Sequence, residues 1–66
     1  MKYLGDMTKG ELMRLKTVDG HPLLCVFGSI DGTYASIALE SDTSRLWFLH
    51  VDARVKLVDG RWEIAE

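Results

Sequence analysis

The sequence predicts an all-β fold, a small, strongly bent antiparallel barrel of five to six short strands, and three observations lead to it. Asp-Gly occurs three times, at residues 19–20, 31–32 and 59–60, each time between apolar runs. Both residues tolerate a positive φ, as the two-residue turns of β-hairpins require. The intervening runs have the length of strands. The chain has only 66 residues, and a bent barrel is the economical way to close short strands around one core.

Length and composition describe one domain, residues 1–66, near the lower limit for independent folding. Hydrophobic residues make up 47% of the chain and charged residues 27%, which is ordinary for a globular domain. The net charge of −2 gives no general attraction to nucleic acid. Cys25 is the single cysteine, and no Cys/His cluster has metal-ligand spacing, so we expect no disulfide, metal or cofactor. No secretory signal and no apolar stretch of about 20 residues is present, so we expect a cytoplasmic protein without a membrane span.

The first elements are an amino-terminal arm and a strand. Residues 1–10 are expected to form an arm or a short helical turn, because Thr8 and Glu11 have the spacing of a helix capping box. Residues 12–18 alternate and lead into the first Asp-Gly pair, which predicts a strand.

The middle of the chain predicts a long hairpin. Residues 22–30 are almost continuously apolar, and Gly28 stands where a strongly bent strand needs a kink. Residues 33–39 place Ala35, Ile37 and Leu39 on one face. Residues 41–44, Ser-Asp-Thr-Ser, predict a turn.

The last third predicts three further strands, at residues 45–51, 55–58 and 61–65, with a tight corner around Asp52 and Ala53. The residues expected to be buried within one chain are Met13, Leu15, Val26, Ile37, Leu39, Val55 and Leu57.

Two segments, residues 23–30 and 46–51, are apolar on both faces. A single barrel of this size has one interior, so half of each segment would face water, and contiguous exposed apolar surface usually marks an interface. Unpaired strand edges also invite pairing with another chain. We therefore expect a homo-oligomer. The expected interface residues are Leu46, Trp47, Phe48, Leu49, Val51, Val55 and Val58.

Three segments resemble the Sm-like proteins, which belong to the SH3-like barrels. Residues 12–20, LMRLKTVDG, resemble the Sm strand that ends in Asp-Gly. Residues 27–40, FGSIDGTYASIALE, resemble the Sm segment in which an aspartate precedes an asparagine. Residues 48–55, FLHVDARV, resemble the segment of bacterial Hfq with a histidine five residues before a valine. The resemblance covers roughly residues 11–58 and implies a ring of about five to seven copies, in which the fourth strand of one subunit pairs with the fifth of the next.

The same resemblance, together with charge, implies candidate RNA contacts. Ser36 stands at the place of the family's base-contacting asparagine if one extra residue is allowed after Asp31, and the lysine that precedes the Hfq histidine is Leu49 here. The candidate contacts are Tyr34, Ser36, Arg45, His50, Arg54 and Lys56. The alternative for His50 is a side chain held at a strand end by one backbone hydrogen bond.

Nothing in the sequence indicates an enzyme, because no nucleophile is paired with a base and no glycine loop could cradle a phosphate. We therefore expect a non-enzymatic, ring-forming Sm-like module with weak RNA binding. The alternative is a protein-interaction module, an adaptor or inhibitor that docks on a larger machine through its strand edges.

Overall fold

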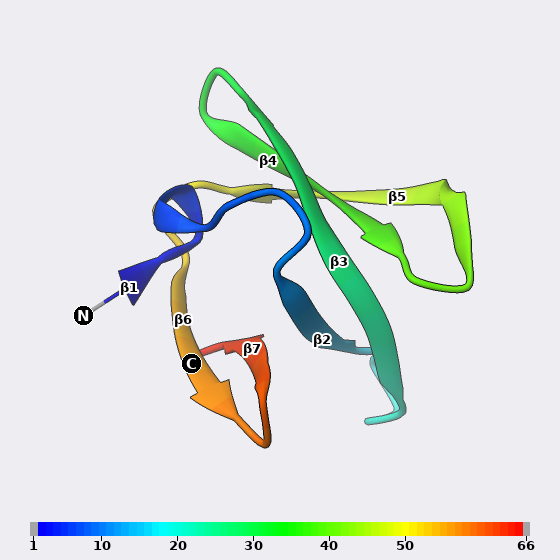
Figure 1. The fold of residues 1–66 in the computed structure, drawn as a ribbon. Helices are drawn as coiled ribbons and strands as arrows, with labels where there is room; N and C mark the ends of the chain where they lie inside the picture. Colours follow the sequence, from blue (N-terminus) through cyan, green and yellow to red (C-terminus); the bar gives the residue numbers. More distant parts are fainter. Residues whose placement is uncertain (1, 66) are drawn as a thin grey trace.

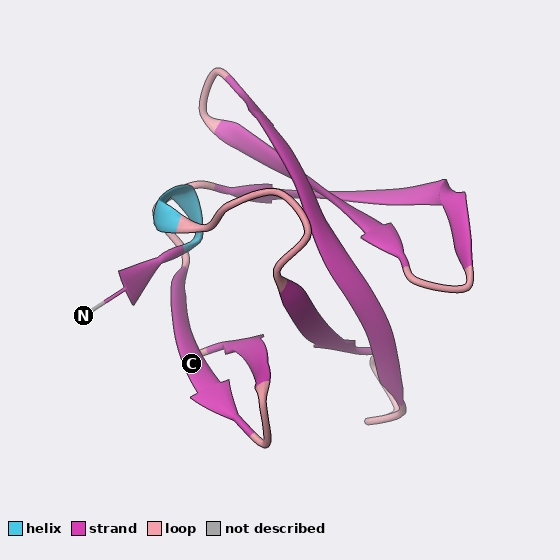
Figure 2. Cartoon of the chain, in the orientation of Figure 1, coloured by secondary structure: helices cyan, strands magenta, loops and turns pink. Residues whose placement is uncertain are grey.

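Residues 2–65 are described by the structure, a computed structural model, and they form one seven-stranded sheet with a single turn of 3-10 helix (Figure 1). Strands account for most of this part of the chain (Figure 2). The elements in chain order are β1 (Lys2–Tyr3), η1 (Leu4–Asp6), β2 (Leu12–Lys16), β3 (Pro22–Asp31), β4 (Tyr34–Leu39), β5 (Asp42–His50), β6 (Arg54–Val58) and β7 (Arg61–Ile64). The predicted all-β class and the short amino-terminal helical turn are confirmed, and the unpredicted strand β1 brings the strand number to seven.

The sheet is mixed, with the order β1-β6-β7-β2-β3-β4-β5. All neighbours are antiparallel except β2 and β7, which run parallel with Met13 opposite Trp62. The expectation of a purely antiparallel sheet was therefore wrong. Because β7 returns from β6 through a hairpin, its direction is fixed by β6, and its free edge meets β2 in the parallel sense.

The sheet is strongly bent, and β1 and β5 are its two ends. The amino-terminal turn is tied to the corner between β5 and β6. Leu4 N–H donates to Ala53 O at 2.7 Å, and Gly5 N–H donates to Val51 O at 2.9 Å. These two hydrogen bonds fix the corner at which the chain passes from β5, at one end of the sheet, to β6, next to the other end.

All three Asp-Gly pairs lie in hairpin connections, as predicted, but only one fills the two central turn positions. Asp59 and Gly60 both have positive φ, 51° and 80°, as a type I′ turn requires. At the β3–β4 hairpin Asp31 is still paired with Tyr34, so the turn positions fall one residue later, at 32–33. The first hairpin has a three-residue loop at 18–20, with a hydrogen bond from Gly20 N–H to Thr17 O at 2.9 Å.

Thr8 and Glu11 interact as in a capping box, although no helix follows. Thr8 N–H and Thr8 Oγ1 both donate to Glu11 Oε1, at 2.8 and 2.7 Å, and these bonds lower the pKa of Glu11. Gly10 and the start of β2 follow at once, so the pair closes a turn rather than starting a helix. The one helical turn lies earlier, at η1, where Tyr3 N–H donates to Asp6 Oδ2 at 3.1 Å.

Gly28 lies at a β-bulge, as the sequence suggested. Phe27 pairs with Ile37 and Ile30 with Ala35, so β3 carries one extra residue between these pairs. Ser29 N–H, displaced from the ladder, donates to Ser36 Oγ at 3.1 Å. A Cβ at position 28 would come within 2.9 Å of both Ser36 O and Ser36 Oγ. The bulge therefore needs a glycine for space and the serine for its hydrogen bond.

We expect Gly28→Ala to destabilise the domain by about 1–3 kcal/mol, because the added methyl group displaces the backbone of β4. Urea denaturation measures the change. Ser29→Ala is the matched control, since it keeps the backbone N–H that bonds to Ser36 and should change stability by less than about 1 kcal/mol. Equal stability of the parent and Gly28→Ala would mean that β3 and β4 are not this close.

The core lies on the concave face of the sheet. Leu4, Met13, Cys25 and Ile37 are fully buried, and Met7, Phe27, Ala35 and Val55 complete the cluster. The predicted inward positions Met13, Ile37 and Val55 are confirmed, and Leu15 and Leu39 are half-buried against the core. Burial raises the pKa of the Cys25 thiol, as expected for a packed, unreactive cysteine.

Two of the predicted core residues were placed wrongly. In β3 the inward side chains are Cys25 and Phe27, so Val26 lies on the opposite face. Leu57 shares the face of Val55 but is 59% exposed, because the β6–β7 hairpin extends beyond the core at that end.

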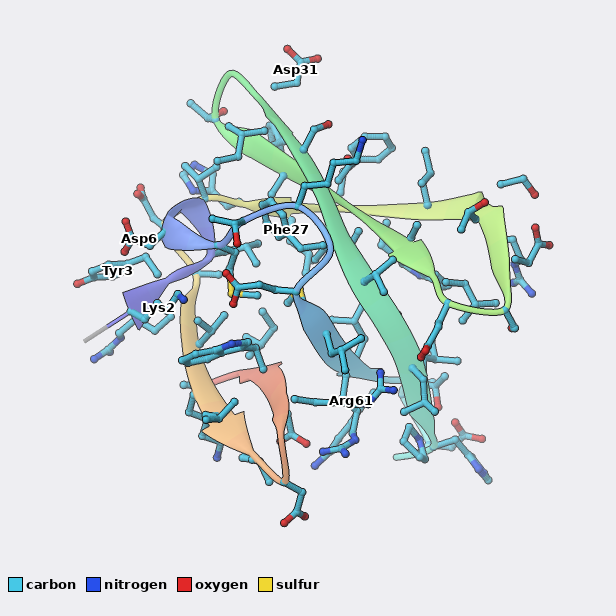
Figure 3. All side chains as sticks on the ribbon, in the orientation of Figure 1. Lys2, Tyr3, Asp6, Phe27, Asp31 and Arg61 are labelled. Carbon is cyan, nitrogen blue, oxygen red and sulfur yellow. The ribbon has the colours of Figure 1, made fainter. Side chains whose placement is uncertain are left out.

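Hydrogen bonds, ion pairs and a cation–π contact join β7 to the rest of the sheet. Arg61 donates to Met13 O at 3.3 Å and to Glu40 at 2.9 Å, and Lys2 lies 4.5 Å from the ring centroid of Trp62 (Lys2 and Arg61 are labelled in Figure 3). Arg14 Nη1 donates to Glu63 Oε2 at 2.7 Å across the parallel β2–β7 pair.

The Arg14–Glu63 pair makes the stability of the domain depend on pH. The hydrogen bond from Arg14 lowers the pKa of Glu63 below its ordinary value of 4.5. The ion pair therefore stabilises the fold at neutral pH. This stabilisation is lost as the pH falls from about 5 through the lowered pKa that Glu63 has in the folded state. We expect Glu63→Gln to be less stable than the parent at about pH 7, and the difference to shrink on acidification. Denaturation at both pH values measures it, and Asp31→Asn, at an exposed hairpin end, is the control. A difference that stays constant with pH would contradict the role of this pair.

Candidate functional site

The structure decides which face of β5 points inward. Trp47 pairs with the buried Ile37 and Leu49 with the buried Ala35, and both are half-buried against the core. Leu46 and Phe48 point to the convex face and are 49% and 62% exposed. Because both faces of this segment are apolar, its alternation alone does not distinguish them.

A row of apolar side chains crosses the convex face from β2 to β5. Leu12 is paired with Val26, Val26 with Ala38, and Ala38 with Leu46. Leu12 and Leu46 are exposed at its ends. The neighbouring exposed apolar residues on β3, β4 and β5 are Leu24, Tyr34 and Phe48. We call this set of residues the convex apolar face.

The outer edge of β5 borders this face. Within residues 2–65, β5 is paired only with β4, and Leu46 to His50 form a regular ladder with Ala38 to Tyr34. Before Leu46 the ladder is interrupted, since the next pair joins Leu39 to Asp42. Asp42 Oδ1 accepts hydrogen bonds from Ser44 N–H and Ser44 Oγ, at 3.2 and 2.6 Å, which lower the Asp42 pKa. The predicted turn chemistry of residues 41–44 thus lies at a bend within β5, and the regular free edge is residues 46–50.

The expected acceptor edge on β6 is shorter than the sequence suggested. β7 occupies one edge along the whole of β6, and β1 pairs with Arg54 and Val55 on the other. Lys56 to Val58 are left beyond β1. Val55 is only 5% exposed and Val51 packs against the core, so these two expected interface side chains serve the interior of one chain. Val58 is half-buried at the end of the β6–β7 hairpin.

The candidate RNA contacts fall into two groups. Tyr34, Ser36 and His50 lie together at the β4–β5 end of the convex face, with Tyr34 opposite His50 and their rings 5.7 Å apart in an edge-to-face arrangement. Phe48, opposite Ser36, joins them. His50 Nδ1 accepts a hydrogen bond from Asp52 N–H at 3.1 Å, so the backbone bond considered for this histidine is present. The Ser36 hydroxyl is engaged with the bulge at Ser29.

The three basic candidates lie elsewhere. Arg45 belongs to the bend of β5, with its guanidinium 6.0 Å from the ring centroid of Trp47. Arg54 begins β6, and Lys56 lines a cavity on the concave side. The structure therefore brings together the ring-bearing candidates but separates them from the basic ones.

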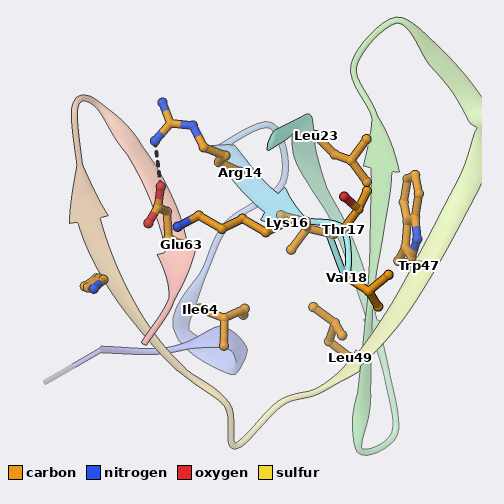
Figure 4. Close-up of a pocket in the computed structure, with 11 residues that line it drawn as sticks. Arg14, Lys16, Thr17, Val18, Leu23, Trp47, Leu49, Glu63 and Ile64 are labelled. Atoms are coloured by element: carbon orange, nitrogen blue, oxygen red, sulfur yellow. Dashed lines mark hydrogen bonds and ion pairs between the residues drawn. The ribbon is translucent and has the colours of Figure 1, made fainter. Parts of the chain in front are cut away.

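That cavity lies between β5 at one end of the sheet and the β6–β7 hairpin, and residues of β2 and β3 also line it. It encloses about 520 Å³. Its apolar residues come from β2, β3, β5 and β7: Leu15, Leu23, Trp47, Leu49 and Ile64. Figure 4 shows Leu49 and Ile64 approaching it from opposite sides, with the Arg14–Glu63 pair at its margin. Neither Leu23 nor Ile64 was singled out from the sequence. Each is an apolar residue at a strand position that the sequence alone would assign to the core. It lines the cavity because β5 and β7 do not pair with each other.

Among residues 2–65 no group of three or more His, Cys, Asp or Glu side chains could hold a metal ion. The described part of the chain also has no helix that could span a bilayer.

Comparisons with protein-family models, with curated proteins and with solved structures give no match for this chain.

Proposed function

We propose that this domain is a non-enzymatic assembly module that associates with further copies of itself through β5. The observation that carries the proposal is the exposure of Leu46 and Phe48 beside a strand edge that has no partner among residues 2–65. Unpaired backbone groups and exposed apolar side chains on the same strand are both satisfied by one added strand.

A two-fold arrangement uses this edge most fully. If two copies of β5 run antiparallel with Phe48 on the axis, Phe48 faces its own copy and Trp47 faces Leu49 of the other chain. Leu46 then lies opposite His50. Aromatic and aliphatic cross-strand pairs stabilise such ladders on both faces.

The ring implied by the Sm-like resemblance uses the same edge differently. There β5 would pair with Lys56 to Val58 of the next copy, the part of β6 that β1 leaves open. This contact is head-to-tail and closes only if the rotation between copies divides a full turn. In this second arrangement each chain is an SH3-like barrel, and strand pairing between subunits closes the ring. Both arrangements predict that the functional unit is an oligomer.

Light scattering at micromolar concentration tests the proposal. The two-fold arrangement predicts about 15 kDa, twice the 7.5 kDa of one chain, and the ring predicts a mass of about five to seven chains. A monomer that persists throughout the concentration range would overturn self-association. The preferred function would then be the alternative, docking of β5 on a different protein.

A second candidate function, binding of single-stranded RNA, is favoured by the exposed rings of Tyr34 and Phe48 on one face, on which bases could stack. The opposing fact is electrostatic, since the net charge is −2 and the Arg45 guanidinium lies by the ring of Trp47, a residue of the inward face.

We therefore expect a Kd no tighter than about 1 µM for a short uridine or adenosine tract at physiological salt, in the range of non-specific binding. Fluorescence anisotropy with a labelled oligonucleotide measures it. Tyr34→Ala should weaken whatever binding occurs, whereas Lys9→Gln, a charge in the amino-terminal turn, should change it only slightly. Tight, sequence-selective binding would show that RNA recognition, rather than assembly alone, is a main function.

A further inference from the structure

The cavity between β5 and the β6–β7 hairpin has the properties of a small-molecule site. Its volume of about 520 Å³ falls within the roughly 300–1,000 Å³ of known ligand pockets. Its walls are aliphatic and aromatic, and Trp47, Leu49 and Ile64 remain only half-buried after the chain has folded. An apolar group that entered would complete the burial of these side chains.

The margin of the cavity is positively charged, in a protein whose net charge is negative. Arg14, Lys16 and Lys56 all line it, and Glu63 is the only acidic residue among the lining residues. The Glu63 carboxylate is held by Arg14, and all three cations lower its pKa, so they lie within electrostatic reach of one point. Figure 4 shows the Lys16 side chain extending across the cavity toward Glu63.

Two positive charges at this margin are not neutralised within the described part of the chain. Arg14 is paired with Glu63, whereas neither Lys16 nor Lys56 has a carboxylate within ion-pair distance among residues 2–65. Both lysines line the cavity and are exposed to water.

We propose that this cavity binds a small amphiphilic anion. Its apolar body lies against Leu15, Leu23, Trp47, Leu49 and Ile64, and its single anionic head group pairs with Lys16 and Lys56. Charge complementarity selects this class, because a neutral apolar molecule leaves both ammonium groups without a counter-charge and a cation is repelled. The inference does not depend on the proposed self-association, although Trp47 and Leu49, which line the cavity, also face the second copy in the two-fold arrangement.

Titration of the whole chain with decanoate, followed by isothermal calorimetry and by backbone amide chemical shifts, tests the proposal. We expect saturable binding of one decanoate per chain, with shifts at residues 14–18, 47–49 and 63–64. Decanol, with the same apolar body and no charge, should bind about tenfold more weakly or worse. Decyl phosphate then identifies the head group, since preference for either anion over decanol supports the proposal.

Three variants separate this site from non-specific adsorption. The double variant Lys16→Gln, Lys56→Gln should weaken decanoate binding about tenfold and leave decanol binding unchanged, because it removes the charges without reshaping the walls. Val18→Glu, at a fully exposed rim position, should also weaken decanoate by like-charge repulsion. Lys9→Gln, away from the cavity, is the control and should bind as the parent does.

Three results would overturn the proposal. They are the absence of saturable decanoate binding, equal affinity of the double variant and the parent, and shifts confined to Phe48 and the convex apolar face. The lysines are exposed, so these variants should fold, and a thermal melt of each confirms that a lost signal reports binding rather than unfolding.

Discussion

Replacing Ile37 with alanine should destabilise the domain by about 2–5 kcal/mol, because its side chain is fully buried in the middle of the sheet. It lies between Phe27 on β3 and Trp47 on β5, so the deletion opens a cavity bounded by two large rings that cannot easily move together. A chain of this length has a total stability of only about 3–10 kcal/mol. The variant is therefore expected to be largely unfolded at moderate temperature, as thermal and urea denaturation will show.

Leu57→Ala is the matched control for this prediction. Both positions carry large aliphatic side chains on strands, and both were expected from the sequence to be buried, but Leu57 is 59% exposed. We expect its replacement to change stability by less than about 1 kcal/mol. Melts should be compared at one protein concentration, because self-association would add to the apparent stability. A parent-like melt for Ile37→Ala would mean that the concave face of the sheet is assigned wrongly.

Replacing Phe48 with lysine should dissociate the oligomer while leaving each chain folded. The side chain lies on the convex face, 62% exposed, so a lysine there meets water in the monomer. In the two-fold arrangement it would face a second lysine across the axis, and like charges directly opposite each other destabilise a ladder. Light scattering should find a folded species of 7.5 kDa, with a circular dichroism spectrum unchanged from the parent.

Two comparisons make this result specific. Val18→Lys is the same type of change at a fully exposed apolar position in the first hairpin, and it should leave the mass unchanged. Trp47→Lys places the charge on the inward face of β5, so it should unfold or aggregate the chain rather than release a stable monomer. An oligomer of Phe48→Lys as large as that of the parent would show that assembly uses another surface.

The local features of the fold were readable from the sequence because short-range chemistry controls them. The Asp-Gly pairs located all three hairpins, Gly28 located the bulge, and the alternation of Ala35, Ile37 and Leu39 gave the inward face of β4. In each case one residue type or one period of two excludes the alternatives.

The misplaced features depend on contacts between distant segments. Thr8 and Glu11 suggested the predicted helical turn, but that turn lies earlier, at Leu4–Asp6, and the pair closes the turn before β2. The parallel pairing of β7 with β2 joins Trp62 to Met13 across most of the chain, and no local pattern encodes it.

The prediction of the candidate site was limited in the same way, because it too depends on contacts between distant segments. In an apolar run such as residues 46–49 both faces satisfy the core, and only pairing with Ile37 and Ala35 assigns Trp47 and Leu49 to the interior. The basic residues Arg45, Arg54 and Lys56 are close in sequence, yet the corner at residues 51–53 leaves Arg45 on β5 and places Arg54 and Lys56 on β6, and these strands are not neighbours in the sheet. Proximity along the chain therefore did not predict which of these charges lie on neighbouring strands.

Amide hydrogen exchange at residues 46–50, measured over a range of protein concentrations, tests the proposed assembly edge most directly. Along an end strand, alternate N–H groups point away from the neighbouring strand and exchange rapidly unless a further strand covers them. We predict that the β5 amides directed away from β4 are protected at high concentration and lose this protection on dilution, while the β3 and β4 amides stay protected throughout. Rapid exchange of the outward β5 amides at every concentration would contradict assembly through this edge.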